Sequence, residues 1–277
     1  MPSASATVGV LLWAVFSITS VHAGSATGRN TESAAQDKTV WIVTLGGGPE
    51  YGPSYEGASN QSFTFVPYFD IRRFGEPPEL SAPDDNIDYS LIKWGALELG
   101  PVAGYRGSRS TSDDSALEGL HDIDWSVDAG IFAQYWVIPD RFRLRVEGRQ
   151  ALHENYGFVA DFFADVFQPV GSKIILSAGP RLSLADTSYM RNNFGITPQE
   201  AADNGSLAPF DIGGGLKSIG FVVSASYQFT DTMTLQVYDK YDRLVGDAAD
   251  SPIVTDIGSA DQNTIGITLR RSFEISF

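Results

Sequence analysis

Residues 122–152 alternate between apolar and polar side chains so regularly that they predict two long β-strands joined by a turn at residues 138–140. Successive side chains of a strand point to opposite faces. One face of this hairpin is therefore apolar. Its residues are Ile123, Trp125, Val127, Ala129, Ile131, Ala133, Tyr135 and Val137 on the first strand and Phe142, Leu144 and Val146 on the second.

The opposite face of the hairpin is predicted to be a ladder of charges, acidic on the first strand and basic on the second. The residues are Asp122, Asp124, Asp128, Arg141, Arg143, Arg145 and Arg149. Opposite charges on neighbouring strands can neutralise one another. Such a two-faced hairpin suits a transmembrane barrel with lipid outside and a polar lumen inside. A soluble sandwich with one wet face gives the same alternation, so other features must decide.

The alternation recurs along the chain. Further strands are predicted near residues 40–46, 63–71, 156–166, 174–184, 219–229, 233–237 and 265–277. Residues 87–105 fit either one kinked strand or a tight hairpin; one strand gives ten in total, and bacterial barrels have even strand numbers. With ten strands the long connections all fall at one end and the short turns at the other. We predict an all-β fold, a transmembrane antiparallel β-barrel of about 10 strands, with 12 possible.

The composition narrows the classes of function. The formal net charge of -15 and the pI near 4.5 argue against nucleic-acid binding, because a phosphate backbone attracts Lys and Arg. The absence of cysteine excludes disulfides, zinc-thiolate sites and cysteine nucleophiles. No segment after the first residues is long and apolar enough for a spanning helix. A membrane location therefore requires a closed barrel, because lipid cannot satisfy open backbone edges.

The first residues are similar to a secretory signal. An apolar run at residues 8–18 precedes Val21-His22-Ala23, a small-x-small type of cleavage site, although no Lys or Arg stands before the run. A membrane anchor is the alternative, but the run is short for a spanning helix. We expect a signal peptide at 1–23, a disordered lead-in at 24–38 and the barrel at 39–277. The processed protein would cross the periplasm to a Gram-negative outer membrane.

Each candidate catalytic or metal-binding site can also be explained as ordinary surface residues. His121 and His153 each stand beside an acid, but neighbours in a strand face opposite ways, so adjacency does not make a catalytic dyad. The acidic pairs 84–85 and 113–114 and the pair Asp247 and Asp250 offer oxygen ligands for a divalent ion. Their spacing matches no calcium loop, which favours solvated loop charge. We therefore predict no catalytic residue, metal or cofactor. Residues 197–205 have the capping signature of a short helix.

Several motifs together resemble the MltA-interacting protein family, also called MipA/OmpV. They lie at residues 46–57, 67–70, 100–101, 112–120, 189–198, 213–217 and 243–254. The last is the most specific, and its residues form the family-signature loop: Arg243, Gly246, Asp247, Asp250, Ser251 and Pro252. It is expected to be a structural cap or a partner-binding loop. Outer-membrane barrels characteristically end in an aromatic assembly signal, here Phe273 or Phe277. Members of the family tend to end near the position of Phe273.

The resemblance implies a Gram-negative outer-membrane barrel without a shared catalytic motif. It suggests a scaffold for murein-remodelling enzymes, in contact with a lytic murein transglycosylase and a bifunctional murein synthase. Lipid and lipopolysaccharide would surround the barrel. A small porin-like channel, or an adhesin that uses the long loops, is the alternative. In a plugged barrel the lumen charges would brace the interior. In a narrow pore they would set the ion selectivity.

Overall fold

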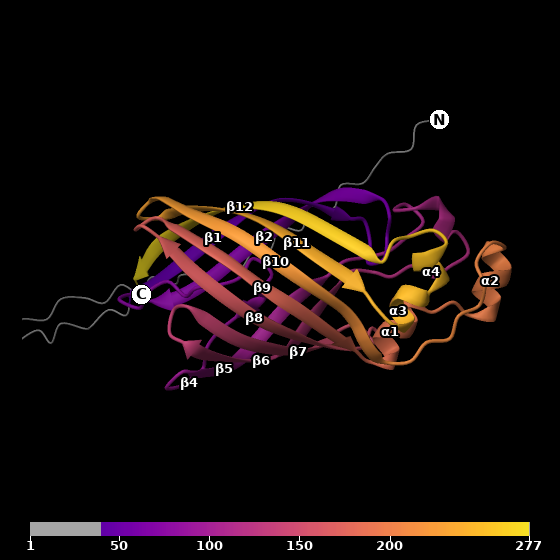
Figure 1. Cartoon of the computed structure of the whole chain (residues 1–277), viewed down its shortest axis with the longest axis horizontal. Coiled ribbons are helices and arrows are strands. Elements are labelled where there is room, and N and C mark those ends of the chain that lie inside the picture. Colours follow the sequence, from indigo (N-terminus) through magenta and orange to yellow (C-terminus); the bar gives the residue numbers. More distant parts are fainter. Residues whose placement is uncertain (1–39, 277) are drawn as a thin grey trace, which may run out of the picture. The chain divides into compact units, whose positions relative to one another are not determined.

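The computed structural model describes residues 40–276, which form an antiparallel β-barrel (Figure 1). The expected signal peptide, the lead-in and Phe277 lie outside the described residues. Ten strands are long: β1 (Val40–Pro53), β2 (Gln61–Arg73), β5 (Leu97–Arg106), β6 (Ser126–Ile138), β7 (Phe142–Ala151), β8 (Phe158–Val170), β9 (Ile174–Ala185), β10 (Gly215–Thr230), β11 (Met233–Leu244) and β12 (Asp261–Ser276). Two short ones, β3 (Ile87–Asp88) and β4 (Ile92–Trp94), bring the described total to twelve.

Consecutive long strands from β5 to β12 pair with their neighbours, and β12 pairs with β1, which pairs with β2. Val40 lies opposite Ser276 and Tyr51 opposite Ile265, so the first and last strands pair along most of their length. The region that fitted either one strand or a hairpin is a hairpin: β3 and β4 both pair with β5, and Gly95 turns the chain with a φ of 61°. Among the described strands no ladder joins β2 to β3, which leaves a seam.

The outward face of the wall is apolar, as the alternation predicts. Ile131 and Tyr135 on β6, Phe221 on β10 and Ile267 on β12 are exposed, while their sequence neighbours point into the barrel. A continuous apolar surface on this scale is unfavourable in water and matches the hydrocarbon core of a bilayer. The wall therefore spans a membrane.

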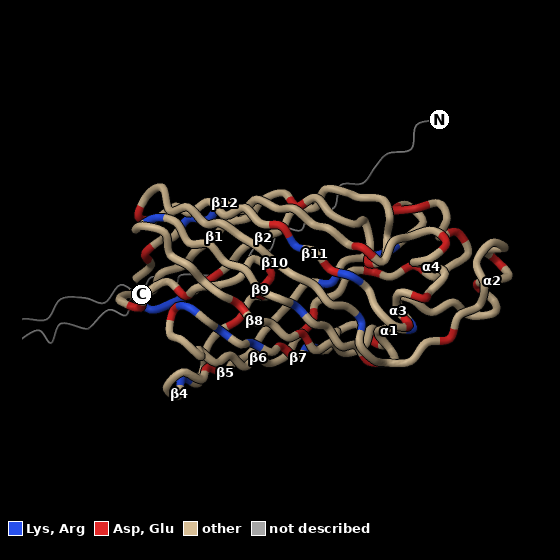
Figure 2. Tube along the Cα trace, in the orientation of Figure 1, with Lys and Arg blue, Asp and Glu red and all other residues tan. Residues whose placement is uncertain are grey.

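The connections differ strongly between the two ends. Short turns join β6 to β7, β8 to β9 and β10 to β11, at the end where β1 begins. The long connections carry the helices, namely η1 (Ser115–Leu117), α1 (Thr187–Phe194), α2 (Pro198–Asn204), α3 (Asp247–Asp250) and α4 (Pro252–Thr255). No helix of the described residues is long and apolar enough to cross a membrane. Figure 2 shows mostly Asp and Glu at this helical end.

Helix α2 confirms the helix expected from the sequence. Thr197 caps it, Pro198 is its first residue, and the Glu200 side chain closes a capping box, which satisfies amide groups that a helix start leaves unpaired. Gly205 ends it in the left-handed region, with a φ of 75°. Buried apolar residues of α1, α4 and the neighbouring loops pack together at the barrel mouth, Phe194 and Ile253 among them, and form a cap.

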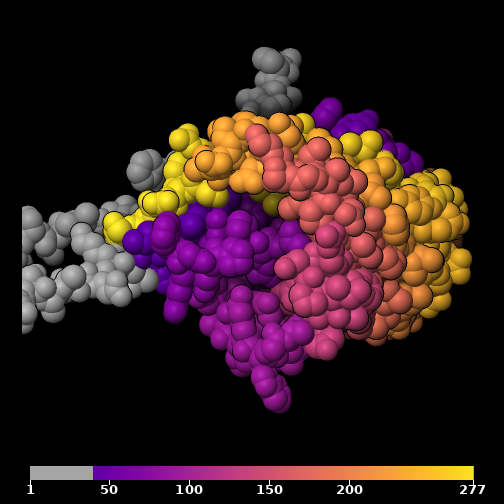
Figure 3. Space-filling model, turned by 60° about the vertical axis from the view of Figure 1, so that its left-hand side comes forward, coloured from indigo at the N-terminus to yellow at the C-terminus, as the bar shows by residue number. Residues whose placement is uncertain are grey.

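The chain after β2 enters the barrel. We call residues 74–86 the plug segment; it carries Asp84 and Asp85, which contact Arg181 of β9 and Arg143 of β7 inside the wall. Its Glu79 accepts a hydrogen bond from Gln134 of β6. In the oblique view of Figure 3, purple atoms, the colour of the chain from β2 to β5, stand between the yellow and magenta walls. The lumen is thus occupied by the chain itself.

Candidate functional site

Arg143 lies at the centre of the lumen charges and is only 1% exposed. Side chains alternate between the two faces of β7, and that of Arg143 points into the barrel. Both of its terminal nitrogens donate to Asp85 of the plug segment, at 2.7 and 2.8 Å, and Nη2 also donates to Asp165 of β8 at 2.7 Å. Such bidentate charge-assisted bonds are the strong ones among hydrogen bonds. The guanidinium therefore joins the plug segment to the wall.

Two further arginines extend this arrangement. Arg145 donates to Glu147 at 2.7 Å and to Asp88. Arg181 donates to Asp84 at 2.8 Å and contacts Asp165 at 2.8 Å. We call this network the sealing layer: Arg143, Arg145, Arg181, Asp84, Asp85, Asp88, Glu147 and Asp165. Every arginine in it contacts at least two carboxylates, so each positive charge is compensated where water is scarce.

The structure places only part of the charge ladder in the lumen. Asp128, Arg143, Arg145 and Arg149 lie on the inner face, and Arg149 contacts Asp161, Glu147 and Asp128. By contrast, three members of the expected ladder are exposed. Asp122 and Asp124 precede β6, which begins only at Ser126, and Arg141 belongs to the turn before β7.

The main partners of the arginines were not in the expected ladder. They come from the plug segment, β3, β7 itself and β8, and the only carboxylate contact from the facing strand β6 is the longer one of Asp128 with Arg149, at 3.8 Å. A signal for the β8 partners existed: Asp161 and Asp165 alternate with the apolar Phe162 and Ala164. The acidic pair Asp84 and Asp85, interpreted from the sequence as solvated loop charge, is instead held against arginines inside the barrel.

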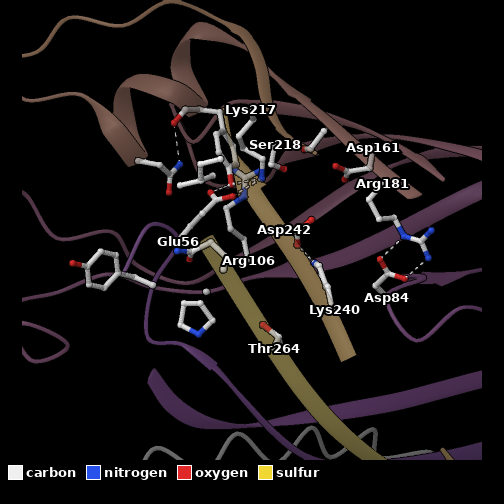
Figure 4. Close-up of a pocket in the computed structure, with 18 of the residues that line it drawn as sticks. Glu56, Asp84, Arg106, Asp161, Arg181, Lys217, Ser218, Lys240, Asp242 and Thr264 are labelled. Carbon is white, nitrogen blue, oxygen red and sulfur yellow. Dashed lines mark hydrogen bonds and ion pairs between the residues drawn. The ribbon is translucent and has the colours of Figure 1, made fainter. Parts of the chain in front are cut away.

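Above the sealing layer, toward the helical end, lies a polar cavity of about 400 Å³ (Figure 4). Lys217 of β10 contacts Glu56 of the β1–β2 loop at 2.6 Å, and the Tyr189 hydroxyl donates to the same carboxylate at 2.5 Å. Burial opposes the effect, but Lys217 and Tyr189 hold the pKa of Glu56 below its usual value. Lys240 contacts Asp242 at 3.1 Å. We call this space the outer cavity.

Two buried side chains of the outer cavity differ from these pairs. Arg109, from the β5–β6 connection, is 3% exposed and donates to the backbone carbonyls of Asn193 and His121 at 2.6 and 3.3 Å. Burial lowers the pKa of its guanidinium to about 10. Tyr55 is 4% exposed, and its hydroxyl has no hydrogen-bond partner among the described residues. Burial, with Asp114 adding to it, raises the pKa of Tyr55 to about 12.

The family-signature loop lies over the barrel mouth. Ser251 is fully buried, caps α4 and donates through Oγ to the Phe194 carbonyl at 2.6 Å. Gly246 precedes α3, and Pro252 is the first residue of α4. The two acids of the loop, Asp247 and Asp250, lie in α3. Its arginine, Arg243, is exposed and contacts Asp261 at 2.5 Å. Phe273 of β12 is exposed on the apolar wall.

The histidines are not brought together. His121 contacts Glu200 of α2 at 2.5 Å and also Asn192, which ties the β5–β6 connection to the cap. His153 stacks on Tyr156, with ring centroids 4.2 Å apart. Residues 40–276 contain no cluster of three or more His, Cys, Asp and Glu side chains arranged to hold a metal ion.

A family model described as MltA-interacting protein MipA matches residues 45–273. No curated protein matches the chain. Solved structures with similar folds include an outer-membrane channel of Pseudomonas putida F1, at 13% identity and a TM-score of 0.35, covering 90% of this chain and 100% of that one.

The NanC porin is 9% identical, with a TM-score of 0.38 and coverage of 83% and 98%. OmpT, an outer membrane protein of Vibrio cholerae, is also 9% identical, with a TM-score of 0.36 and coverage of 88% and 100%.

Proposed function

This chain belongs to the MltA-interacting protein MipA family and is a barrel of the Gram-negative outer membrane, and from that premise we propose its function. We propose that it is a non-enzymatic scaffold for murein-remodelling enzymes. The partners proposed are a lytic murein transglycosylase and a bifunctional murein synthase. The observation that carries the proposal is the sealing layer. A barrel whose lumen is filled by its own plug segment presents surfaces to partners and offers no wide route for solutes.

The short-turn end is the docking surface proposed for these enzymes, because the long connections would face the cell exterior. The hairpin between β4 and β5 projects from the wall there (Figures 1 and 3). Trp94 near its tip is 81% exposed, and Leu91 and Ile92 beside it are exposed as well. Tryptophan is enriched among the residues that dominate protein interfaces. Lipid and lipopolysaccharide would cover the remaining wall.

An affinity pull-down from detergent-solubilised envelopes tests the scaffold. The wild-type chain is expected to retain a transglycosylase and a synthase, identified by mass spectrometry, and Trp94→Ala to lose them. Trp125→Ala is the matched control, because Trp125 is 55% exposed near the opposite end. Heat-modifiable gel mobility establishes that each variant still forms a barrel. Recovery of neither enzyme by the wild-type chain would refute the proposal.

A narrow channel is the second candidate, supported by the polar outer cavity, whose lining reaches Asp84 and Arg181 of the sealing layer. Current through it would have to pass the sealing layer. Planar-bilayer recordings separate the two candidates: a steady conductance of the wild-type barrel that changes in Arg145→Ala favours the channel. A silent wild-type barrel that conducts only after deletion of residues 76–86 favours a sealed scaffold.

A further inference from the structure

We propose that the outer cavity is a binding site for a small hydroxylated organic anion, held by Arg109 and Tyr55. The occupant would enter from the helical end and stay above the sealing layer. This site does not depend on the scaffold proposal, because it lies at the opposite end from the short turns. Its volume of about 400 Å³ falls within the range of small-molecule sites.

The first argument is that no carboxylate of residues 40–276 directly contacts the buried Arg109; Glu200 and Asp122 act on its charge only at longer range. Within the described part of the chain its guanidinium has no carboxylate partner and contacts only carbonyl oxygens. Burying a charge is costly unless it is paired. The other cavity cations lie beside carboxylates: Lys217 contacts Glu56, and Lys240 contacts Asp242. An anion bound at Arg109 would supply the missing charge through a planar, bidentate fork.

The second argument is the unused hydroxyl of Tyr55. It lines the same cavity and accepts or donates no hydrogen bond among residues 40–276. A buried polar group without a partner destabilises the folded state, and native structures contain few of them. Tyr55 and Arg109 come from two different loops and both line the outer cavity, so one small ligand can contact both. The Arg109 guanidinium can only donate hydrogen bonds and the Tyr55 hydroxyl is free to donate one, which favours a ligand with acceptor oxygens.

The third argument is the composition of the cavity wall. Six of its side chains are cationic and four are anionic, in a chain whose net charge is -15. The cationic residues are Arg106, Arg109, Arg149, Arg181, Lys217 and Lys240, and the anionic ones are Glu56, Asp84, Asp161 and Asp242. Neutral polar groups such as Ser218 and Thr264 complete the wall (Figure 4). They match hydroxyl groups on the ligand.

Titration calorimetry of the detergent-solubilised barrel tests the site with gluconate as the probe. Sorbitol is the matched control ligand, because it has the same six-carbon polyol chain without the carboxylate. Gluconate is expected to bind with an affinity that falls as salt is raised, and sorbitol to give no heat. Equal binding of the two, no binding of gluconate at millimolar concentrations, or binding of inorganic phosphate without gluconate would each overturn the proposal.

Two variants locate the site. Tyr55→Phe keeps the packed ring and removes only the unpaired hydroxyl, so the ligand-free barrel should unfold no earlier while the Kd for gluconate rises about 5- to 10-fold. Tyr227→Phe, at an exposed tyrosine on the outer wall, is the control and should bind as wild type. Arg109→Met should raise the Kd at least about 10-fold. An unchanged Kd in Tyr55→Phe overturns the proposal even if Arg109→Met fails to fold.

Discussion

Arg143 and Arg109 are almost equally hidden from solvent in one barrel, yet their surroundings are opposite in kind. Arg143 contacts two carboxylates with short hydrogen bonds, whereas Arg109 contacts only two backbone carbonyls. The sealing layer is therefore saturated, and the outer cavity is not. Burial alone does not distinguish a brace from a binding site; the balance of charge around the buried group does.

The largest effect is expected from Arg143→Met. The change leaves Asp85 and Asp165 buried without their shared cation, which costs about 3–5 kcal/mol of the free energy of unfolding. Denaturant unfolding in lipid vesicles, followed by tryptophan fluorescence, measures this loss. Arg141→Met is the control: Arg141 is exposed in the neighbouring turn and should change the stability by no more than about 0.5 kcal/mol. Equal losses in the two variants would remove the sealing layer as a stabilising feature.

A smaller effect is expected from Arg109→Met in the absence of ligand. The variant removes a buried charge that no described carboxylate directly contacts, which favours folding. It also leaves the carbonyls of Asn193 and His121 without a donor, which opposes folding. We expect a net loss of about 1 kcal/mol, measured by the same unfolding assay. A loss as large as that of Arg143→Met would contradict the comparison, because it would mean that Arg109 is as fully compensated as Arg143.

The sequence predicted the strands of the barrel wall much better than the plug segment inside the barrel. Alternation is a local property, so it placed Arg143 and Arg145 on the inner face of β7 without any knowledge of the partner strands. Asp84 and Asp85 belong to an irregular segment without periodicity. Asp84 meets Arg181 from 97 positions away, a contact that no local pattern encodes.

The outer cavity was missed for a related reason. Tyr55 and Arg109 lie in connections between strands, where side-chain direction follows from tertiary packing and not from a repeat. The cap helix α2 was predictable because its capping box is written in four consecutive residues. The contact of Glu200 in that helix with His121 could not be predicted, because the two residues are 79 positions apart in the sequence.

The smallest effect concerns the contact between the cap and the β5–β6 connection, beside the outer cavity. Burial opposes the change, but hydrogen bonds from Thr197 and His121 lower the pKa of Glu200 from 4.5 to about 2. A carboxyl with a lowered pKa stabilises the fold above its unfolded value and loses that contribution as the pH falls from about 4.5 towards 2. Because the pair is partly exposed, we expect no more than about 1 kcal/mol.

Glu200→Gln should remove this pH dependence. Amide exchange of helix α2 at pH 3 and pH 7 measures it: wild type should exchange faster, relative to its intrinsic rate, at pH 3, and Glu200→Gln should be equally protected at both. Glu118→Gln, at an exposed acid of the neighbouring loop, should behave as wild type. Slow exchange of wild-type α2 at both pH values would mean that the cap is held by its apolar contacts alone.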